Sequence, residues 1–117
     1  MKNGSLYIQF WVWLMDNKLY VLVRGDLSIQ QQAVQAGHAV AEYLLREPKP
    51  SWSNGTLVYL GVRDQEHLRR WGIKLRDLEM PYVIFQEPDL NNEITALATI
   101  TDNYRIFKSL RLIGSVA

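Results

Sequence analysis

Apolar and polar residues alternate along the chain in blocks that predict strands and helices in turn. Residues 18–25, KLYVLVRG, form a continuous apolar run rich in β-branched side chains, which is typical of a buried strand. Residues 56–62, 82–85 and 93–100 have a similar character and predict three further strands. The pattern therefore predicts four strands, separated by segments with a different spacing.

Two of those segments have the spacing of helices. Ser28 and Gln31 form the S-x-x-Q pattern of a capping box, which satisfies free backbone N–H groups at a helix start, and Asp64 is placed to cap the second helix. The side chains expected to face the core are Ile29, Ala33, Ala36, Gly37, Val40, Ala41 and Leu44 in the first helix, and Leu68, Trp71, Leu75 and Leu78 in the second. The small residues in the first set would let that helix lie very close to a sheet.

The remaining segments complete the predicted domain. Residues 47–55 form a Pro/Ser/Asn/Gly loop, and a short last helix is expected from Asp102 or Asn103 to about Leu110. The order β-α-β-α-β-β-α predicts an α/β fold: a three-layer α/β/α sandwich around a mixed four-stranded sheet. We expect one domain over residues 18–117, preceded by an N-terminal apolar extension over residues 1–17.

That extension contains the apolar run LYIQFWVWLM at residues 6–15. The run is shorter than the roughly 20 residues that span a bilayer, and no small-residue cleavage site of a signal peptide follows it. Two alternatives remain: the run packs on the domain, or Met15 is the native start and the upstream residues are an extension. If the run is translated, its alternation fits a strand that adds to a sheet edge or is buried against a second copy of the chain.

Composition excludes several kinds of site. The chain has 117 residues, a net charge of +1, no cysteine and two histidines, His38 and His67. The absence of cysteine excludes disulfides, thiolate catalysis and Cys-type zinc sites, and the lack of clustered ligands leaves no metal or cofactor to expect. Because the net charge is nearly neutral, any contact with nucleic acid would need a local basic patch. We expect a cytoplasmic protein with no membrane segment.

Two stretches resemble a known family. In YVLVRGDLSIQQQAVQAGHAVAEYLL, the strand ends in Arg24-x-Asp26 and the helix carries the pattern A-x-Q-x-x-H-A, which begins at Ala33. Downstream, PYVIFQEPDLNNEITALAT has an acidic loop residue after the third strand and a threonine in the fourth. Together, and in this order, they resemble the archaeal and eukaryotic type of peptidyl-tRNA hydrolase over residues 18–113.

The resemblance implies both a fold and an activity. It implies a mixed four-stranded sheet with helices on both faces, a homodimer, and metal-independent hydrolysis of the ester between a peptide and the 3′ ribose of tRNA. The family carries lysines at the start of the first helix, where this chain has Ile29, Gln30 and Gln31. The family aspartate after the third strand corresponds to Glu87, and Thr95 matches one of its threonines, whereas the shorter loop leaves the other without a counterpart.

Five residues are therefore candidates for catalysis. Ester hydrolysis needs a base for the water and donors for the oxyanion. Glu87 or Asp89 would be the base, and Thr95 would be a partner of the water or the carbonyl. Gln31 would be a donor where the family has lysine, and His38 lies on the small-residue side of the same helix. Four of them also have a structural interpretation: Gln31 as the capping partner of Ser28, His38 as a packing residue, and the two carboxylates as part of a solvated turn.

Six further residues are candidates for substrate binding. Arg24, Asp26 and Gln35 lie near the predicted site, although Arg24 and Asp26 would equally form an ion pair that fixes their loop. The others, Arg63, Arg70 and Lys74, share one face of the second helix with His67 and form either a solvent face or a stripe for the RNA backbone.

Two functions remain open at this point. One is a peptidyl-tRNA hydrolase-like enzyme with weak turnover, because the lysines are missing. The other is a catalytically inactive member of the fold that binds tRNA or a protein partner.

Overall fold

The computed structural model describes residues 16–47 and 51–113, so the predicted strand over residues 6–13 lies outside the described residues. The strands are β1 (Lys18–Arg24), β2 (Leu57–Val62), β3 (Val83–Glu87), β4 (Glu93–Thr101) and β5 (Arg111–Leu112), and the helices are α2 (Ile29–Arg46) and α3 (Gln65–Asp77). Short 3-10 turns follow β3 and β4, at Pro88–Leu90 and Tyr104–Phe107.

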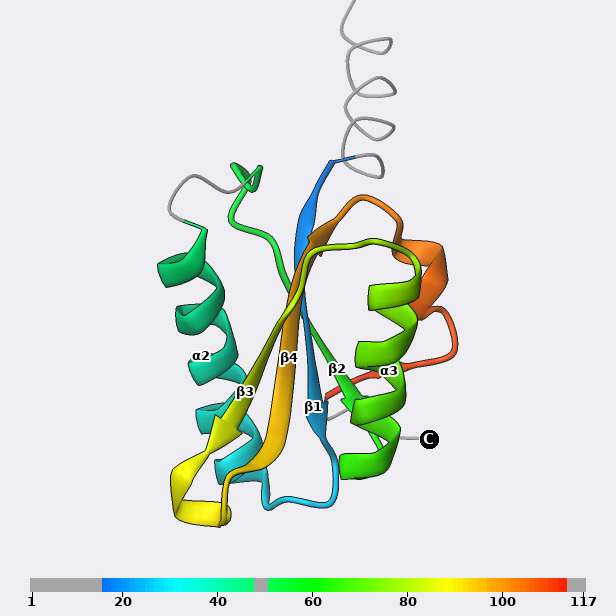
Figure 1. The fold of residues 1–117 in the computed structure, drawn as a ribbon. Helices are drawn as coiled ribbons and strands as arrows, with labels where there is room; N and C mark the ends of the chain where they lie inside the picture. The colour runs from blue at the N-terminus through cyan, green and yellow to red at the C-terminus, as the bar shows by residue number, and fades with distance from the viewer. Residues whose placement is uncertain (1–15, 48–50, 114–117) are drawn as a thin grey trace, which may run out of the picture.

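The strands form a mixed sheet in the order β3-β4-β1-β2-β5, shown in Figure 1. β1 pairs with β2 in parallel and with β4 in antiparallel orientation, while β4 also pairs antiparallel with β3. Every residue of β1 is buried, as its continuous apolar run predicts for a strand in the middle of a sheet with both faces covered. The β1 strand is thus the centre of the domain.

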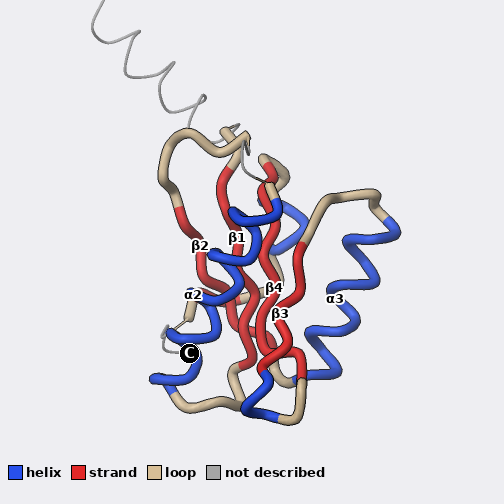
Figure 2. Tube along the Cα trace, turned by 60° about the vertical axis from the view of Figure 1, so that its left-hand side comes forward, coloured by secondary structure: helices blue, strands red, loops and turns tan. Residues whose placement is uncertain are grey.

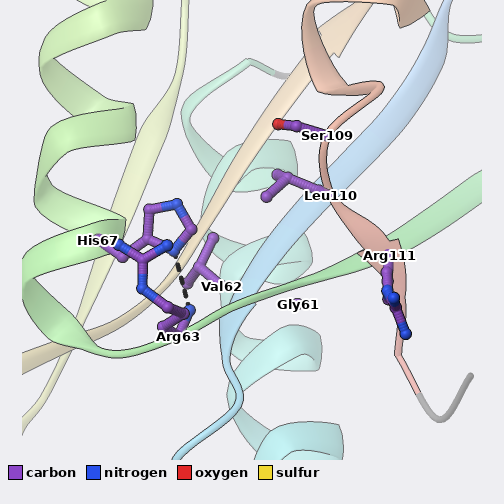
Figure 3. Close-up of a pocket in the computed structure, with 7 residues that line it drawn as sticks. All are labelled: Gly61, Val62, Arg63, His67, Ser109, Leu110 and Arg111. Atoms are coloured by element: carbon purple, nitrogen blue, oxygen red, sulfur yellow. Dashed lines mark hydrogen bonds between the residues drawn. The ribbon is translucent and has the colours of Figure 1, made fainter. Parts of the chain in front are cut away.

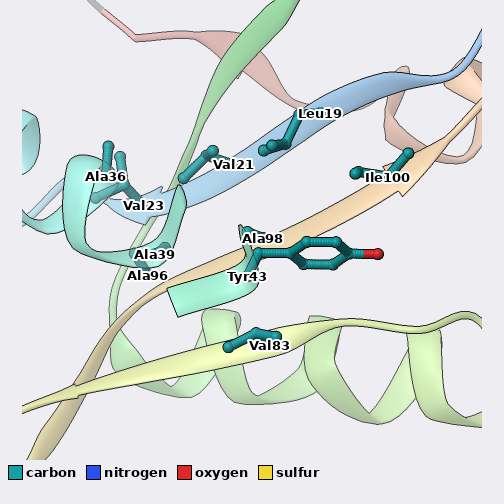
Figure 4. Packing of buried hydrophobic residues seen from close by; sticks show 10 residues of the cluster. All are labelled: Leu19, Val21, Val23, Ala36, Ala39, Tyr43, Val83, Ala96, Ala98 and Ile100. Carbon is teal, nitrogen blue, oxygen red and sulfur yellow. The ribbon is translucent and has the colours of Figure 1, made fainter. Parts of the chain in front are cut away.

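One helix covers each face of the sheet (Figures 1 and 2). Under α2, alternate residues of β1 and β4 pack against alanines and a tyrosine of the helix: Leu19, Val21, Val23, Ala96, Ala98 and Ile100 against Ala36, Ala39 and Tyr43, as Figure 4 shows. Alanines on both sides bring the helix backbone close to the strands. The expected three-layer arrangement is therefore present in the described residues.

The face under α3 is filled by larger side chains. Leu68, Trp71 and Leu75 of α3 pack on the other set of alternate strand residues, which includes Tyr20 and Leu22. The turn at Tyr104–Phe107 closes this core, since the Phe107 ring lies 4.8 Å from that of Tyr20 and 5.3 Å from that of Trp71, between ring centroids. The aromatic contacts join the C-terminal segment to the domain.

The structure corrects three details of the prediction. The sheet has five strands rather than four, because residues 111–112 pair with β2. The helix expected up to Leu110 is only a 3-10 turn. On α2 the buried face is Gln32, Gln35, Ala36, Ala39 and Tyr43, while Ile29, Ala33, Gly37 and Ala41 of the predicted face are exposed. Leu78 ends α3 as its C-cap and is also exposed.

No helix within the described ranges is long and apolar enough to cross a membrane.

Candidate functional site

The candidate site lies at the point where successive strands are added to opposite sides of β1. From β1 the chain passes through α2 to the neighbouring β2, and from β2 it passes through α3 to β3, on the other side of β1. The carboxyl ends of these three strands meet at the lower end of the sheet in Figure 1. In open α/β sheets, ligands bind outside the carboxyl ends of the strands at such a switch point.

A buried glutamine organises this end of the sheet. Gln35, fully buried on α2, donates from Nε2 to Glu87 Oε1 at 2.8 Å and to Gln31 Oε1 at 3.2 Å. Its Oε1 accepts a hydrogen bond from the Thr95 hydroxyl at 2.6 Å. Because a carboxylate only accepts, the Gln35 amide must direct its NH₂ toward Glu87, and the Thr95 hydroxyl stabilises that orientation.

The Glu87 carboxylate is the acidic group that the structure holds in this network. Its side chain is 13% exposed, and its Oε2 accepts from the backbone N–H of Asp89 at 3.4 Å. The hydrogen bond from Gln35 is the main cause that lowers the pKa of Glu87 from its ordinary value, with smaller contributions from the Asp89 N–H and His38. Glu87 is therefore charged at neutral pH and reachable from solvent.

The side chain of Gln31 lies beside this carboxylate. Its backbone N–H donates to the Ser28 hydroxyl at 3.1 Å, so Ser28 caps α2 as predicted. The reciprocal half of the capping box is not formed, because the Gln31 side chain accepts from Gln35 instead. Its NH₂ group makes no hydrogen bond within the described residues and is free to donate to a ligand.

His38 completes the edge of the site, one turn of α2 after Gln35. Its ring stacks on Phe85 of β3, with centroids 4.6 Å apart and planes within 7°. Its Nε2 lies 3.9 Å from Glu87 Oε1, which is too long for a direct hydrogen bond. The ring is 46% exposed, so it is accessible from solvent while it packs on Phe85.

Two other candidate catalytic side chains, Thr95 and Asp89, lie in surroundings that differ from those of Glu87. Thr95 is fully buried, and its hydroxyl hydrogen is used by Gln35, so it orients the amide rather than facing solvent. Asp89 is exposed, and its carboxylate has no hydrogen-bond or ion-pair partner in the described part of the chain. Of the two candidate bases, Glu87 is the one that the network holds.

Arg24 and Asp26 are bound to each other, and the Asp26 side chain remains 41% exposed. Arg24 makes two hydrogen bonds to Asp26, at 3.0 and 2.9 Å, one to Glu93 at 2.6 Å, and one to the carbonyl of Ile94. Arg24 is buried, and both carboxylates raise its pKa, so it remains charged. The structural interpretation of this pair is supported: it fixes the loop between β1 and α2.

Three more polar side chains belong to this end of the sheet but carry no sequence motif. Gln32 donates to the carbonyl of Leu27 at 2.8 Å, Gln65 accepts from the backbone N–H of Ile94 at 2.9 Å, and Glu93 pairs with Arg24. Each bonds across a loop or to a distant strand, so spacing along the chain gives no signal for it.

Two basic residues of α3, and Arg63 just before its N-cap, lie apart from the glutamine network. Arg63, Arg70 and Lys74 line a hollow of about 280 Å³ together with His67 and Trp71, on the side of the sheet that α3 covers. Glu87, Gln35 and His38 belong to the α2 side. The structure thus separates the predicted site residues into two groups.

Within the described ranges, no three His, Asp or Glu side chains are grouped so that they could hold a metal ion. The chemistry available at the glutamine network is that of one carboxylate, one imidazole and amide donors.

Comparison with known proteins supports the fold alone. No family model matches the chain, and no curated protein matches it significantly. Among solved structures it is similar to a protein of unknown function from Agrobacterium tumefaciens, with a TM-score of 0.64 and 17% sequence identity. The match covers 83% of this chain and 97% of the other. The mixed α/β architecture is therefore shared with a known structure, and function has to be argued from the site.

Proposed function

We propose that this chain is a peptidyl-tRNA hydrolase-like protein that weakly hydrolyses the ester between a peptidyl or aminoacyl group and tRNA. The observation that carries the proposal is the charged Glu87 carboxylate, held by Gln35 beside the free amide of Gln31 and the ring of His38. His38 belongs to a motif that resembles the family, Glu87 corresponds to its aspartate, and Gln31 stands where the family has lysine.

The geometry suits direct attack of a water molecule on the ester carbonyl. A water between Glu87 Oε1 and His38 Nε2 would lose its proton to the carboxylate as it attacks the ester carbonyl. The developing oxyanion would be stabilised by the Gln31 NH₂ and by the first turn of α2, whose dipole favours negative charge. His38 would hold the water in place, and Glu87 would then pass the proton it took from the water to the departing ribose oxygen.

The same features account for weak turnover. A general base works best when its pKa is near the working pH, and the hydrogen bond from Gln35 moves the pKa of Glu87 in the opposite direction. An amide at position 31 donates a hydrogen bond but supplies no positive charge. Losing one well-placed donor in an oxyanion site costs about 10²–10³ in rate, and we expect a similar loss from the missing charge.

The decisive experiment is single-turnover hydrolysis of labelled peptidyl-tRNA by Gln31→Lys, compared with the unaltered chain. Lysine at this position would restore a charge beside Glu87, and the rate should rise. Gln30→Lys is the matched control, because it adds the same charge to the same exposed turn one residue away from the network. Glu87→Gln should abolish whatever rate is seen.

A rate that stays at the uncatalysed value in both the unaltered chain and Gln31→Lys would refute the hydrolase proposal. It would favour the alternative, an inactive member of the fold that binds tRNA or a protein. The exposed basic side chains of α3 are the observation behind that alternative. In that case tRNA affinity should fall with salt and with the pair Arg70→Ala and Lys74→Ala. Arg69→Ala, which removes a charge already paired with Glu66, should leave it unchanged.

Assembly as a homodimer is part of the same proposal. Light scattering of the full chain and of a chain that begins at Met15 would measure it. Equal masses and equal melting temperatures would make residues 1–14 dispensable for assembly.

A further inference from the structure

Two hollows adjoin on the α3 side of the domain and share two residues. One, of about 330 Å³, is lined by Gly61, Val62, Arg63, His67, Ser109, Leu110 and Arg111, shown in Figure 3. The other, of about 280 Å³, is lined by Arg63, His67, Arg70, Trp71 and Lys74. Because Arg63 and His67 belong to both, they form the wall between the two hollows.

The cations around these hollows are mostly unneutralised. Neither Arg63 nor Arg111 has an ion-pair or hydrogen-bond partner for its side chain in the described part of the chain, and both are exposed. Lys74 lies over the Trp71 ring at 4.6 Å and has no carboxylate partner there. Arg70 reaches Glu66 only at 4.0 Å. Like charges gathered without acidic partners cost free energy, which a bound anion would recover.

His67 is oriented by the backbone to donate into this space. Its Nδ1 accepts a hydrogen bond from the N–H of Arg63 at 2.9 Å, drawn as a dashed line in Figure 3. The proton of the neutral ring is therefore on Nε2. Burial is the main cause that lowers the pKa of His67, and Arg63 and Arg70 lower it further against the opposite effect of Asp64. The ring is a neutral donor at neutral pH.

We propose that the double hollow around Arg63 and His67 binds a ligand that carries two linked phosphate groups. Each hollow has its own cations, Arg111 in one and Arg70 with Lys74 in the other, and Arg63 stands between them. A guanidinium binds phosphate oxygens through paired N–H groups, and the Nε2–H of His67 adds a donor to the shared wall. One phosphate would occupy one hollow, whereas two linked phosphates would use both.

This inference does not rest on the ester hydrolysis proposed above, because the two sites share no residue. Two sources would supply the same chemistry: the diphosphate of a nucleotide, or successive phosphates of an RNA backbone. The experiment therefore uses inorganic diphosphate first and separates the sources afterwards.

The readout is the NMR titration of the two histidines of the unaltered chain with inorganic diphosphate. A bound anion favours the protonated ring, so the His67 signals should shift with saturation and the pKa of His67 should rise. His38, in the other site, is the internal control and should not respond. Orthophosphate at the same ionic strength should bind about tenfold more weakly, since it loses the charge-assisted bonds of one hollow.

Variants test whether the binding uses this wall. Arg63→Gln should weaken diphosphate binding by about tenfold or more, and Arg111→Gln should weaken it less. Arg69→Gln is the control, since Arg69 is an exposed arginine of α3, the helix that Arg63 precedes, and it lines neither hollow. Glu87→Gln should bind as the unaltered chain does. Should Arg63→Gln fail to fold, the pair Arg70→Gln and Lys74→Gln gives the same test for the second hollow.

The proposal is overturned if His67 does not respond, if His38 responds equally, or if Arg69→Gln loses as much affinity as Arg63→Gln. If binding is confirmed, a nucleoside diphosphate and a short RNA are compared at one salt concentration. Tighter binding of the nucleotide identifies a small phosphorylated ligand, and tighter binding of the RNA identifies a nucleic-acid backbone.

Discussion

The two helices cover opposite faces of one sheet with different chemistry. Toward the sheet, α3 presents leucines and a tryptophan, which pack on a core of large apolar and aromatic side chains. By contrast, α2 buries two glutamines beside its alanines and Tyr43, and the amide of one of them reaches two other elements of the domain. One face is suited to stability, and the other holds polar groups in fixed positions at the end of the sheet.

The difference predicts two kinds of vulnerability. A large apolar side chain under α3 contributes through contact area, so its loss leaves a cavity. An amide under α2 contributes through hydrogen bonds, so its loss leaves other polar groups buried without partners. Substitutions on the two faces should therefore differ in how much they lower the free energy of unfolding. They should also differ in whether a second substitution restores part of the loss.

Leu75→Ala should give the largest loss of stability. Leu75 is fully buried under α3, and truncation of such a leucine lowers the free energy of unfolding by about 2–5 kcal/mol. Denaturant unfolding followed by circular dichroism measures it. Ile73→Ala, on the exposed side of the same helix with 43% of the residue accessible, is the control and should cost much less. Equal losses at the two positions would show that α3 is not the apolar face we describe.

Gln35→Leu should have the next largest effect, a loss of about 1–3 kcal/mol, because Thr95 and Glu87 lose their shared partner. Thr95→Val removes the hydroxyl and should cost a similar amount. In a double-mutant cycle, the two changes together should cost less than their sum, since replacing both partners by apolar groups removes the unpaired atoms. Strict additivity in unfolding free energy would mean that the 2.6 Å hydrogen bond does not couple them.

The contrast also explains which parts of the structure the sequence predicted well. On α3, buried apolar residues recur at every third or fourth position, so periodicity identified Leu68, Trp71 and Leu75. The same rule was only partly right on α2: Ala36 is buried, and Val40 and Leu44 pack against the core, but the rule treats glutamine as exposed. Gln35 is buried because Glu87 and Thr95, 52 and 60 residues further along the chain, supply its partners. Periodicity within one helix contains no information about such partners.

The C-terminal segment was mispredicted for a related reason. A short last helix was expected from Asp102 or Asn103 to about Leu110. In the structure, the contacts of Phe107 with Tyr20 and Trp71 fix a single tight turn, and residues 111–112 then extend the sheet. These partners lie far away in the sequence, so tertiary packing decides the local structure.

The candidate site was predicted in part. The sequence resemblance selected Glu87, Gln31 and His38, and the structure places all three around Gln35. The role of Gln35 as the residue that joins them depends on three hydrogen bonds between different elements, and spacing does not reveal these. The separation of Arg63, Arg70 and Lys74 on the other face follows from the topology of the sheet.

The two helix glycines offer a smaller test of the same comparison. An added Cβ at Gly37 of α2 meets no atom within 4 Å, so Gly37→Ala should raise the free energy of unfolding by about 0.5–1 kcal/mol through helix propensity. At Gly72 of α3, the Cβ would lie 3.2 Å from Ile84 Cδ1. Gly72→Ala should therefore gain less, or lose stability. Thermal melts of the two variants measure the difference, and an equal gain at both would contradict the close packing of α3 on β3.

The smallest expected effect is the pH dependence that Glu87 adds to stability. Its pKa is lowered in the folded state, so its contribution is present above the ordinary value of 4.5 and is lost as the pH falls through the depressed value. The difference in unfolding free energy between the unaltered chain and Glu87→Gln should therefore be present at neutral pH and diminish below 4.5. Because the hydrogen bond from Gln35 is the main cause of the shift, the same comparison in a Gln35→Leu background should show a weaker pH dependence. A difference that is constant with pH in both backgrounds would mean that Gln35 does not stabilise the charged form of Glu87.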